Sequence, residues 1–284
     1  MMQAPDVMQR FEIGIDELLL LRDHIPGLIL PNLAAPARTP HDDLTPLNSL
    51  KRNGLLDSST VLGDPDWTGL IRPPLLSCLA LQMTGELLFQ ADAWSPESQI
   101  TSSITVTDGV TSTLTISANT DREAASPPLV SIELGDVSNL STTLAGLIPP
   151  TSPTQETFAP VTVGVTQSRA LIAALRTGDS RVIEAVAAET QLENATSVLA
   201  RIAGAMSASF RIRTFTRDGR CVYAGSWFHT SAGWTKFDLN AQNPLSAEDI
   251  TESATITISP ATQAGMEIEL LGLVAEGVRD SYVR

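Results

Sequence analysis

A short phrase that occurs twice constrains the fold of this chain more than any other feature of its sequence. It reads FEIGID over residues 11–16 and VTVGVT over residues 161–166. Each copy alternates apolar and polar residues, reaches a glycine, and then offers an Asp or Thr that can cap a helix. An apolar run follows each copy. We therefore expect a strand that leads directly into a helix at both places.

The segments behind the two phrases run in the same order. Hydrophobic periodicity, proline positions and turn dipeptides such as Asp108-Gly109 define these segments. In the first half they predict helices at 16–24, at 42–52 and at 64–83 (with Pro73-Pro74 breaking or restarting it), strands at 87–92, 104–106, 114–116 and 129–134, and a helix at 136–148. In the second half they predict helices at 166–176, 179–189 and 191–206, strands at 209–216, 221–229, 234–238 and 254–259, and a last helix that starts at Pro260.

This repeated order predicts an α/β fold of the α+β type with two quasi-symmetric halves. Each half is expected to be a largely antiparallel meander sheet with helices, and the two are joined around a central sheet. Residues 1–150 form the first half and residues 151–284 the second, with a proline-rich linker at 149–160. Joining the halves edge to edge would hide strand edges that otherwise invite aggregation. Gly14 and Gly164 should then occupy equivalent places in one domain.

Composition excludes several classes of partner. The 284 residues carry a formal net charge of -14, which argues against nucleic acid and against an anionic membrane surface, because both attract clustered Lys and Arg. No apolar run approaches the roughly 20 residues that a membrane helix needs, and no signal peptide is recognisable. Cys78 and Cys221 form no pair motif, as expected in a reducing compartment. We expect a cytoplasmic protein without membrane insertion.

The sequence offers no catalytic constellation and no cofactor or metal motif. Neither phosphate-binding glycine loop is present, and none of His24, His41 and His229 has the spacing of a metal ligand. Asp64 and Asp66 superficially resemble a paired-carboxylate site. We interpret them instead as residues at the N-terminus of a helix, where acids satisfy free backbone donors. We therefore expect no enzyme, no cofactor and no metal.

The aromatic residues are the strongest candidates for a binding surface. Trp94 is expected in a loop between two meander strands, where a tryptophan is less readily buried and can anchor an interface. Trp227, Phe228 and Trp234 cluster in the corresponding part of the second half, where core packing is the competing interpretation. Trp67 is expected on a helix.

The order of these segments, the helix that ends in Leu-Ile-Pro-Pro and the segment SWFHTSAGW at residues 226–234 together resemble the EspG family. Members of this family commonly carry Trp-Phe/Leu-Asp-Thr-x-x-Gly-Arg-Tyr in their second half. The segment of this chain matches that pattern at Trp227, Phe228, Thr230 and Gly233, differs at His229 and Trp234, and lacks the Arg-Tyr pair. The likeness spans roughly residues 10–275 and concerns architecture, not catalysis.

The resemblance implies a cytosolic chaperone of actinobacterial type VII (ESX) secretion. Such a chaperone binds the helical tip of a helical-hairpin substrate, of the PE–PPE or WXG100 type, and keeps it soluble until export. In the family the partner contacts the central sheet, the loop after its second strand and C-terminal helices. The partner-binding residues expected here are Trp94, Glu97, Gln99, Ile100, Trp227, Phe228 and Trp234. The chaperone is expected to be a monomer or a weak dimer.

Two other hypotheses stay open. The chain could be a small-molecule-binding protein or a hydrolase that uses the cleft between its halves, with His229 as the residue to test. It could also be a structural subunit of the same secretion machinery.

Overall fold

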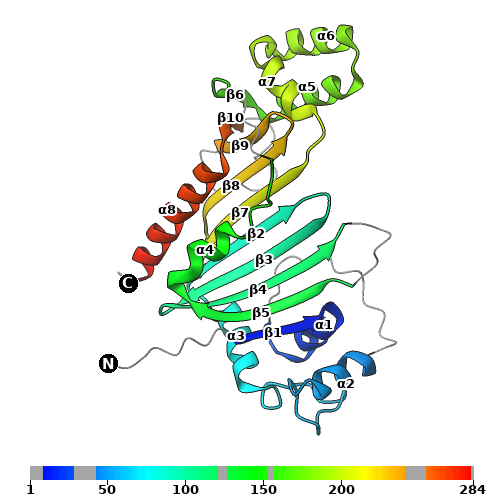
Figure 1. The fold of residues 1–284 in the computed structure, drawn as a ribbon, viewed down its shortest axis with the longest axis vertical. Helices are drawn as coiled ribbons and strands as arrows, with labels where there is room; N and C mark the ends of the chain where they lie inside the picture. The colour runs from blue at the N-terminus through cyan, green and yellow to red at the C-terminus, as the bar shows by residue number, and fades with distance from the viewer. Residues whose placement is uncertain (1–8, 29–42, 121–126, 153–156, 241–253, 283–284) are drawn as a thin grey trace.

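The computed structural model describes residues 9–28, 43–120, 127–152, 157–240 and 254–282, and it contains a single antiparallel sheet of ten strands. The strands lie side by side in the order β1-β5-β4-β3-β2-β7-β8-β9-β10-β6 (Figure 1). Those of the first half are β1 (Gln9–Gly14), β2 (Leu87–Trp94), β3 (Ser98–Thr107), β4 (Val110–Asn119) and β5 (Leu129–Asp136). Those of the second half are β6 (Val161–Gly164), β7 (Ala208–Thr216), β8 (Cys221–Thr230), β9 (Gly233–Asn240) and β10 (Thr255–Ala261).

The strand order is the same in both halves when it is counted outward from the centre. The central pair is β2 and β7, which run antiparallel along their whole length from Leu87↔Thr216 to Trp94↔Ser209. From that pair each half continues through its remaining meander strands and ends on the strand of the repeated phrase. The α+β class, the quasi-symmetric halves and the edge-to-edge joining are thereby confirmed.

The two glycines of the repeated phrase hold equivalent positions. Gly14 ends β1, pairs with the first residue of β5 and caps helix α1 (Ile15–His24), while Gly164 ends β6, pairs with the first residue of β10 and caps helix α5 (Val165–Thr177). The cap is therefore the glycine and not the expected Asp16 or Thr166, which lie inside the first turn.

A side chain three residues further on folds back over each of these glycine caps. The Gly14 N–H donates to Glu17 Oε2 at 2.6 Å, as a Glu or Gln at this position does in a capping box. At Gly164 a Cβ atom would lie 1.8 Å from Gln167 Oε1. The sequence reasoning did not include these returning side chains.

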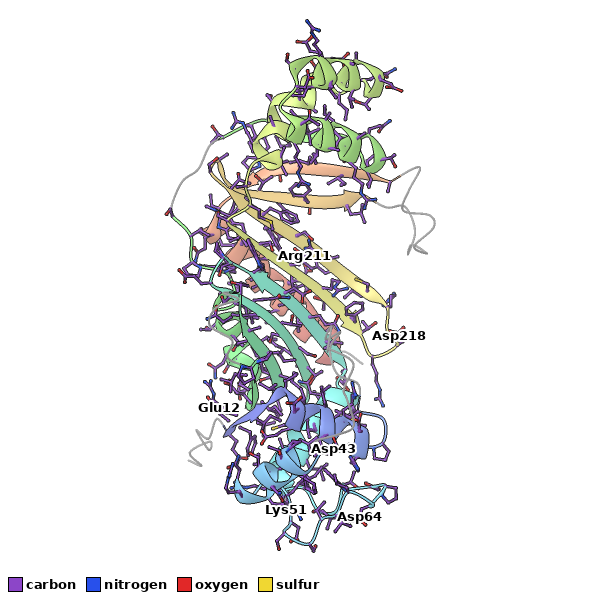
Figure 2. The ribbon with its side chains drawn as sticks, turned by 90° about the vertical axis from the view of Figure 1, so that its right-hand side faces the viewer. Glu12, Asp43, Lys51, Asp64, Arg211 and Asp218 are labelled. Atoms are coloured by element: carbon purple, nitrogen blue, oxygen red, sulfur yellow. The ribbon has the colours of Figure 1, made fainter. Side chains whose placement is uncertain are left out.

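Helices cover the two ends of one sheet face. At the first end α1, α2 (Leu44–Arg52) and α3 (Pro73–Thr84) enclose a core with apolar residues of β1, β4 and β5. At the other end α5, α6 (Ser180–Thr190) and α7 (Thr196–Ala203) enclose a second core with residues of β6 and β10. Register places both cores on the same side of the sheet, so its middle lies between two groups of helices (Figure 2).

The opposite face is covered in its middle by α4 (Leu140–Ala145) and α8 (Gln263–Tyr282) (Figure 1). Each of these helices follows the last meander strand of its half and packs across the junction. Gly277 of α8 approaches β2 so closely that a Cβ there would lie 2.6 Å from Leu87 Cδ2. Beyond α4, Thr151 accepts a hydrogen bond from Trp234 of β9 at 3.0 Å. The two halves therefore share one core.

Several expected elements differ from the structure. Residues 64–72 form turns and not a helix, with Asp66 accepting hydrogen bonds from the backbone and hydroxyl of Thr68. Trp67 is consequently not helical, and it is fully buried and stacked on His24 at 3.8 Å. A polar residue before a turn can bind its own backbone two residues on, which mimics a helix start in sequence.

Other helices and one strand have boundaries that differ from those expected. Pro73 restarts the chain as the first residue of α3, as proline in a first turn can. The helix expected at 191–206 is a 3₁₀ turn followed by α7 and ends at Ala203. Pro260 belongs to β10, where β6 no longer pairs with it, so it leaves no ladder bond unmade.

Candidate functional site

The middle of the sheet carries a surface that no described helix covers. Side chains alternate along a strand, and Leu87, Phe89 and Ala91 of β2 pack under α4 and α8. The intervening residues Gln90, Asp92 and Trp94 point to the other side of the sheet. The residues of β3, β7 and β8 in register with these three point the same way, toward the viewer in Figure 2. We call this surface the open face: Gln99 and Thr101 of β3, Gln90, Asp92 and Trp94 of β2, Ser209, Arg211 and Arg213 of β7, and Ala224, Ser226 and Phe228 of β8.

One row across the open face is aromatic. Trp94 pairs with Ser209, and Ser209 pairs with Phe228, so the two rings flank a small residue two strand spacings apart, which is about 10 Å. Both aromatic side chains are half-buried. The Phe228 ring packs edge-on against Phe237 at 4.9 Å. Two aromatic rings in this row are thus separated by the small side chain of Ser209.

The next rows carry charge. Arg211 is exposed and lies over the Phe228 ring at 5.4 Å, and Figure 2 labels it near the centre of the face. Arg213 reaches Asp92 at 3.6 Å, with both side chains close to half exposed. Ion pairs at this exposure contribute little to stability. The centre of the open face is therefore cationic in a protein of net charge -14.

A cavity lies at each end of the open face. The first, of about 570 Å³, lies beside the end of α7 and is lined by Arg176, Ile202, Ala203, Gly204, Ala205, Met206, Phe228, Thr230 and Phe237. The second, of about 290 Å³, lies beside the end of α3 and is lined by Gln82, Met83, Gly85, Leu88, Gln90, Ser103, Thr105, Phe215, Thr216, Arg217 and Gly219. Both helices precede a central strand, so the cavities reflect the quasi-symmetry.

The structure divides the expected partner-binding residues between two faces. Trp94, Gln99 and Phe228 lie in one row of the open face. Trp94 is the last residue of β2 and not a loop residue, while Glu97 is exposed in the turn that follows. Alternation turns Ile100 to the other side, where it packs against the core under α4 and α8.

Trp227 and Trp234 do not reach the surface. Trp227 is 1% exposed and Trp234 is 5% exposed, and both belong to the shared core. Trp227 packs on Phe210 at 5.7 Å, and the Trp234 ring lies edge-on to His229 at 5.2 Å. For these two tryptophans core packing is the correct interpretation, and the expectation that they contact a partner is wrong.

The arginines of β7 are the residues that sequence reasoning missed. Arg211 and Arg213 alternate with Phe210 and Ile212 in the strand predicted at 209–216, and neither arginine was selected as a binding residue. The available signal was a long cationic side chain at alternate positions of a central strand. It indicates that one face of the strand is uncovered, because a central strand covered on both faces is apolar throughout.

His229 is buried, and it forms a pair with a serine. Its Nδ1 lies 2.7 Å from Ser207 Oγ, and its Nε2 has no hydrogen-bond partner among the described atoms. Burial lowers the pKa of His229, and the backbone of Ser152 acts in the opposite direction. No carboxylate completes a triad with this pair among the described residues.

The other expected titratable groups have structural partners. His24 ends α1 and its Nδ1 lies 3.0 Å from the Leu20 carbonyl. His41 lies outside the described residues. Within the described parts of the chain, no three His, Cys, Asp or Glu side chains gather in a way that could hold a metal ion.

The two cysteines lie in different environments. Burial raises the pKa of the Cys78 thiol to about 11, whereas Cys221 is exposed.

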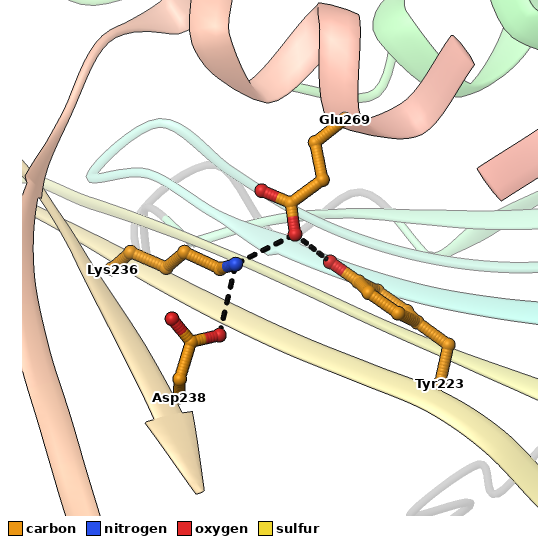
Figure 3. Close-up of polar contacts among 4 residues, drawn as sticks. All are labelled: Tyr223, Lys236, Asp238 and Glu269. Carbon is orange, nitrogen blue, oxygen red and sulfur yellow. Dashed lines mark hydrogen bonds and ion pairs between the residues drawn. The ribbon is translucent and has the colours of Figure 1, made fainter. Parts of the chain in front are cut away.

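A polar cluster on the opposite face fixes α8 to the sheet (Figure 3). Glu269 Oε1 accepts hydrogen bonds from Tyr223 at 2.5 Å and from Lys236 at 2.6 Å, and Lys236 also reaches Asp238 at 2.9 Å. Burial and the Glu269 carboxylate raise the pKa of the Tyr223 hydroxyl well above its usual range. Burial alone would lower the pKa of Lys236, but its bonds to Glu269 and Asp238 outweigh it and raise the pKa.

No protein-family model matches the chain, and no curated protein is significantly similar to it. Within the described residues, none of the helices combines the length and the apolar character that crossing a membrane requires.

Proposed function

We propose that the chain is a non-enzymatic chaperone or adaptor whose open face holds the helical tip of a secretion substrate. The observation that carries the proposal is the open face itself. It is a strip of four adjacent strands between two groups of helices, and it combines aromatic rings with arginines. Aromatic and arginine side chains are the types enriched at interface hot spots.

The dimensions of the strip suit a helical partner. Four strands span three spacings, which is about 14 Å. A helix with its side chains is about 10–12 Å across. One helix can therefore lie in the strip, or the tip of a helical hairpin can enter it end-on. Two helices lying side by side would need a wider surface, because their axes alone are 8–10 Å apart.

The chemistry of the strip also suits an apolar client. Phe228, Phe237 and Met206 line the larger cavity, and the Met206 side chain is 41% exposed. Methionine adapts to irregular apolar surfaces. Covering an apolar helical tip with such a surface would prevent aggregation of the client before export.

The identity of the client rests on the resemblance to the EspG family. On that basis we propose a cytosolic chaperone for helical-hairpin substrates of a type VII secretion system, of the PE–PPE or WXG100 type. The quasi-symmetric sheet supports this proposal, because the resemblance implied two such halves. The open face supports it further, because the family uses its central sheet for its partner.

Co-expression with helical-hairpin proteins encoded beside this chain tests the proposal. We expect a soluble one-to-one complex by size-exclusion chromatography with light scattering. Trp94→Ala should weaken the complex by more than about 1 kcal/mol, or roughly fivefold. Val61→Ala is the matched control, since Val61 is an apolar residue that is 54% exposed in the turns before Trp67, away from the central sheet and from the C-terminal helices. Equal affinities for both variants would exclude the open face.

A cavity at the junction of the halves favours small-molecule binding as a second candidate. It measures about 390 Å³ and is lined by Leu87 of the first half and by Tyr223, Leu273 and Gly277 of the second. The hydroxyl of Thr214 in its lining is buried without a partner among described atoms. His229 does not line this cavity, so the hydrolase form is tested separately. A panel of ester and phosphate substrates is compared between the natural protein and His229→Ala, and equal turnover would exclude His229.

A structural subunit of the secretion machinery is the third candidate, and it differs from a chaperone in where the chain ends up. A chaperone leaves its client before export and is absent from the purified machinery. Affinity purification of the membrane complex, followed by quantification of this chain against the other subunits, separates the two. A fixed stoichiometric amount would support the structural role.

A further inference from the structure

We propose that the open face recognises a single acidic helix that crosses it diagonally, with one apolar side chain in each cavity and a carboxylate on Arg211 between them. This inference rests on the proposed function and specifies the chemistry of the bound segment. It makes three separate claims, namely the direction of the helix, the spacing of its apolar residues and its charge.

The direction follows from the register of the three central strands. Phe228 lines the larger cavity and lies opposite Ser209 of β7, whereas Gln90 lines the smaller cavity and lies opposite Arg213 of β7. Arg211 stands midway between Ser209 and Arg213 on β7, and β7 is the middle strand of the three. A line between the cavities therefore crosses the sheet diagonally and passes over Arg211.

The same register gives the length of that line. Phe228 and Gln90 are two strand spacings apart, about 10 Å, and are offset by four residues along the strands, about 14 Å. The diagonal is therefore about 17 Å. An α-helix rises about 1.5 Å per residue, so this distance corresponds to about 11 residues. Eleven residues are close to three full turns, which places both apolar side chains on one face of the helix.

The position of the acidic residue follows from helical geometry. A residue on the same face as the first apolar residue, and near the middle of the span, lies about four or seven positions after it. A carboxylate there would project toward Arg211. The bound helix is thus expected to have apolar residues at its two contact ends and one or two acidic residues between them.

The charge of the surface selects an acidic occupant. Arg211 forms no ion pair with a described residue, and the Asp92 carboxylate is already bound by Arg213. Arg176 is the charged residue in the lining of the larger cavity, and Arg217 is the one in the lining of the smaller cavity. Arginines therefore follow the whole diagonal on a protein of net charge -14. Complementary charge favours an acidic helix and orients it during association.

Labelled helical peptides binding to the full chain test the inference directly. The probe is an alanine-rich helix of about 20 residues with two leucines eleven positions apart and glutamates four and seven positions after the first. Comparison peptides replace both glutamates by glutamine or by lysine, or bring the leucines to seven positions apart. Affinity is measured by fluorescence anisotropy at low salt, where exposed charges act most strongly.

We expect the glutamate peptide to bind at least about fivefold more tightly than the glutamine peptide and than the peptide with closer leucines. Arg211→Gln should remove the preference for glutamate, and Arg211→Glu should reverse it toward the lysine peptide. Arg10→Gln is the matched control, because it removes one exposed arginine on β1, far from the open face, and should leave the preference intact.

The outcomes separate this inference from the proposed function. Equal binding of the glutamate and glutamine peptides, lost together in Phe228→Ala, would overturn the acidic residue while retaining a helix on the open face. Absence of peptide binding alongside a soluble client complex that depends on Trp94 would overturn the diagonal helix and leave the chaperone proposal standing. Absence of peptide binding and of a soluble client complex would overturn the diagonal helix and the chaperone proposal together.

Discussion

Two neighbouring residues of β8 should respond very differently to truncation. Trp227 points into the core shared by the halves, is 1% exposed and packs on Phe210. Phe228 points to the open face and is half-buried, with its main described ring contact to Phe237. We expect Trp227→Ala to lose stability with little direct effect on a client, and Phe228→Ala to lose client binding at a small cost in stability.

The magnitudes follow from what each ring loses. Truncating a fully buried Trp or Phe to Ala costs about 3–5 kcal/mol, because a cavity remains. For a domain of this size that corresponds to a fall in Tm of about 6–20 °C. The Phe228 ring loses one aromatic pair, worth about 0.5–1.5 kcal/mol, and part of its burial. At the middle of each range, about 4 kcal/mol against about 1 kcal/mol plus the lost burial, the two variants should differ by about 2–3 kcal/mol.

Urea unfolding followed by circular dichroism gives the two free energies of unfolding, and the client or peptide titration gives the two affinities. The affinity of Trp227→Ala is measured at a temperature where it remains folded. Equal destabilisation by the two variants would refute the reasoning, because it would mean that Phe228 is packed as tightly as the core. Unchanged affinity in Phe228→Ala would remove the aromatic row from the binding surface.

Four further predictions concern the core and its titratable groups. Glu269→Gln removes the carboxylate that binds a tyrosine and a lysine. The amide hydrogens of α8 should then exchange faster, and the free energy of opening obtained from their exchange should fall by about 1.5–3 kcal/mol. The pKa of His229 is lowered in the folded chain, so on acidification the unfolded chain takes up the histidine proton at a higher pH than the folded chain. The free energy of unfolding should therefore be full above about pH 6.5 and fall as the pH is lowered. His229→Gln should make the free energy of unfolding less dependent on pH. Ellman's reagent should titrate Cys221 in the native protein and Cys78 only after unfolding, because the latter is buried with a raised pKa. Gly85→Ala would put a Cβ 2.6 Å from a β3 threonine, at a cost of about 1–3 kcal/mol in chemical unfolding.

The elements themselves were largely predictable from sequence because their signals are local. Alternation marks β2 and β4, and helical spacing marks α5 and α6, whatever they pack against. The segment around Trp67 was misinterpreted for the same reason. Asp64-Pro65-Asp66 has the local signature of a helix start, yet the chain there is held in turns by Asp66 and by burial of Trp67 against His24.

The candidate site was predictable only in part. Trp94 and Phe228 were selected as aromatic residues suited to an interface and Gln99 through the family resemblance, and all three fall in one row of the open face. Trp227 and Trp234 have the same residue type and lie in the core. Residue type does not reveal which face of a strand is covered, because a shift of one position exchanges the two faces.

The sequence by itself determined the order of the elements and, through Gly14 and Gly164, the likeness of the two halves. Only the tertiary structure decided that β2 pairs with β7, that α4 and α8 cross the junction on one side, and that the middle of the other side is left open between two groups of helices. The physical reason is that strand alternation and helix caps are short-range interactions within a few residues. Pairing and coverage bring together residues more than a hundred positions apart, which no local pattern specifies.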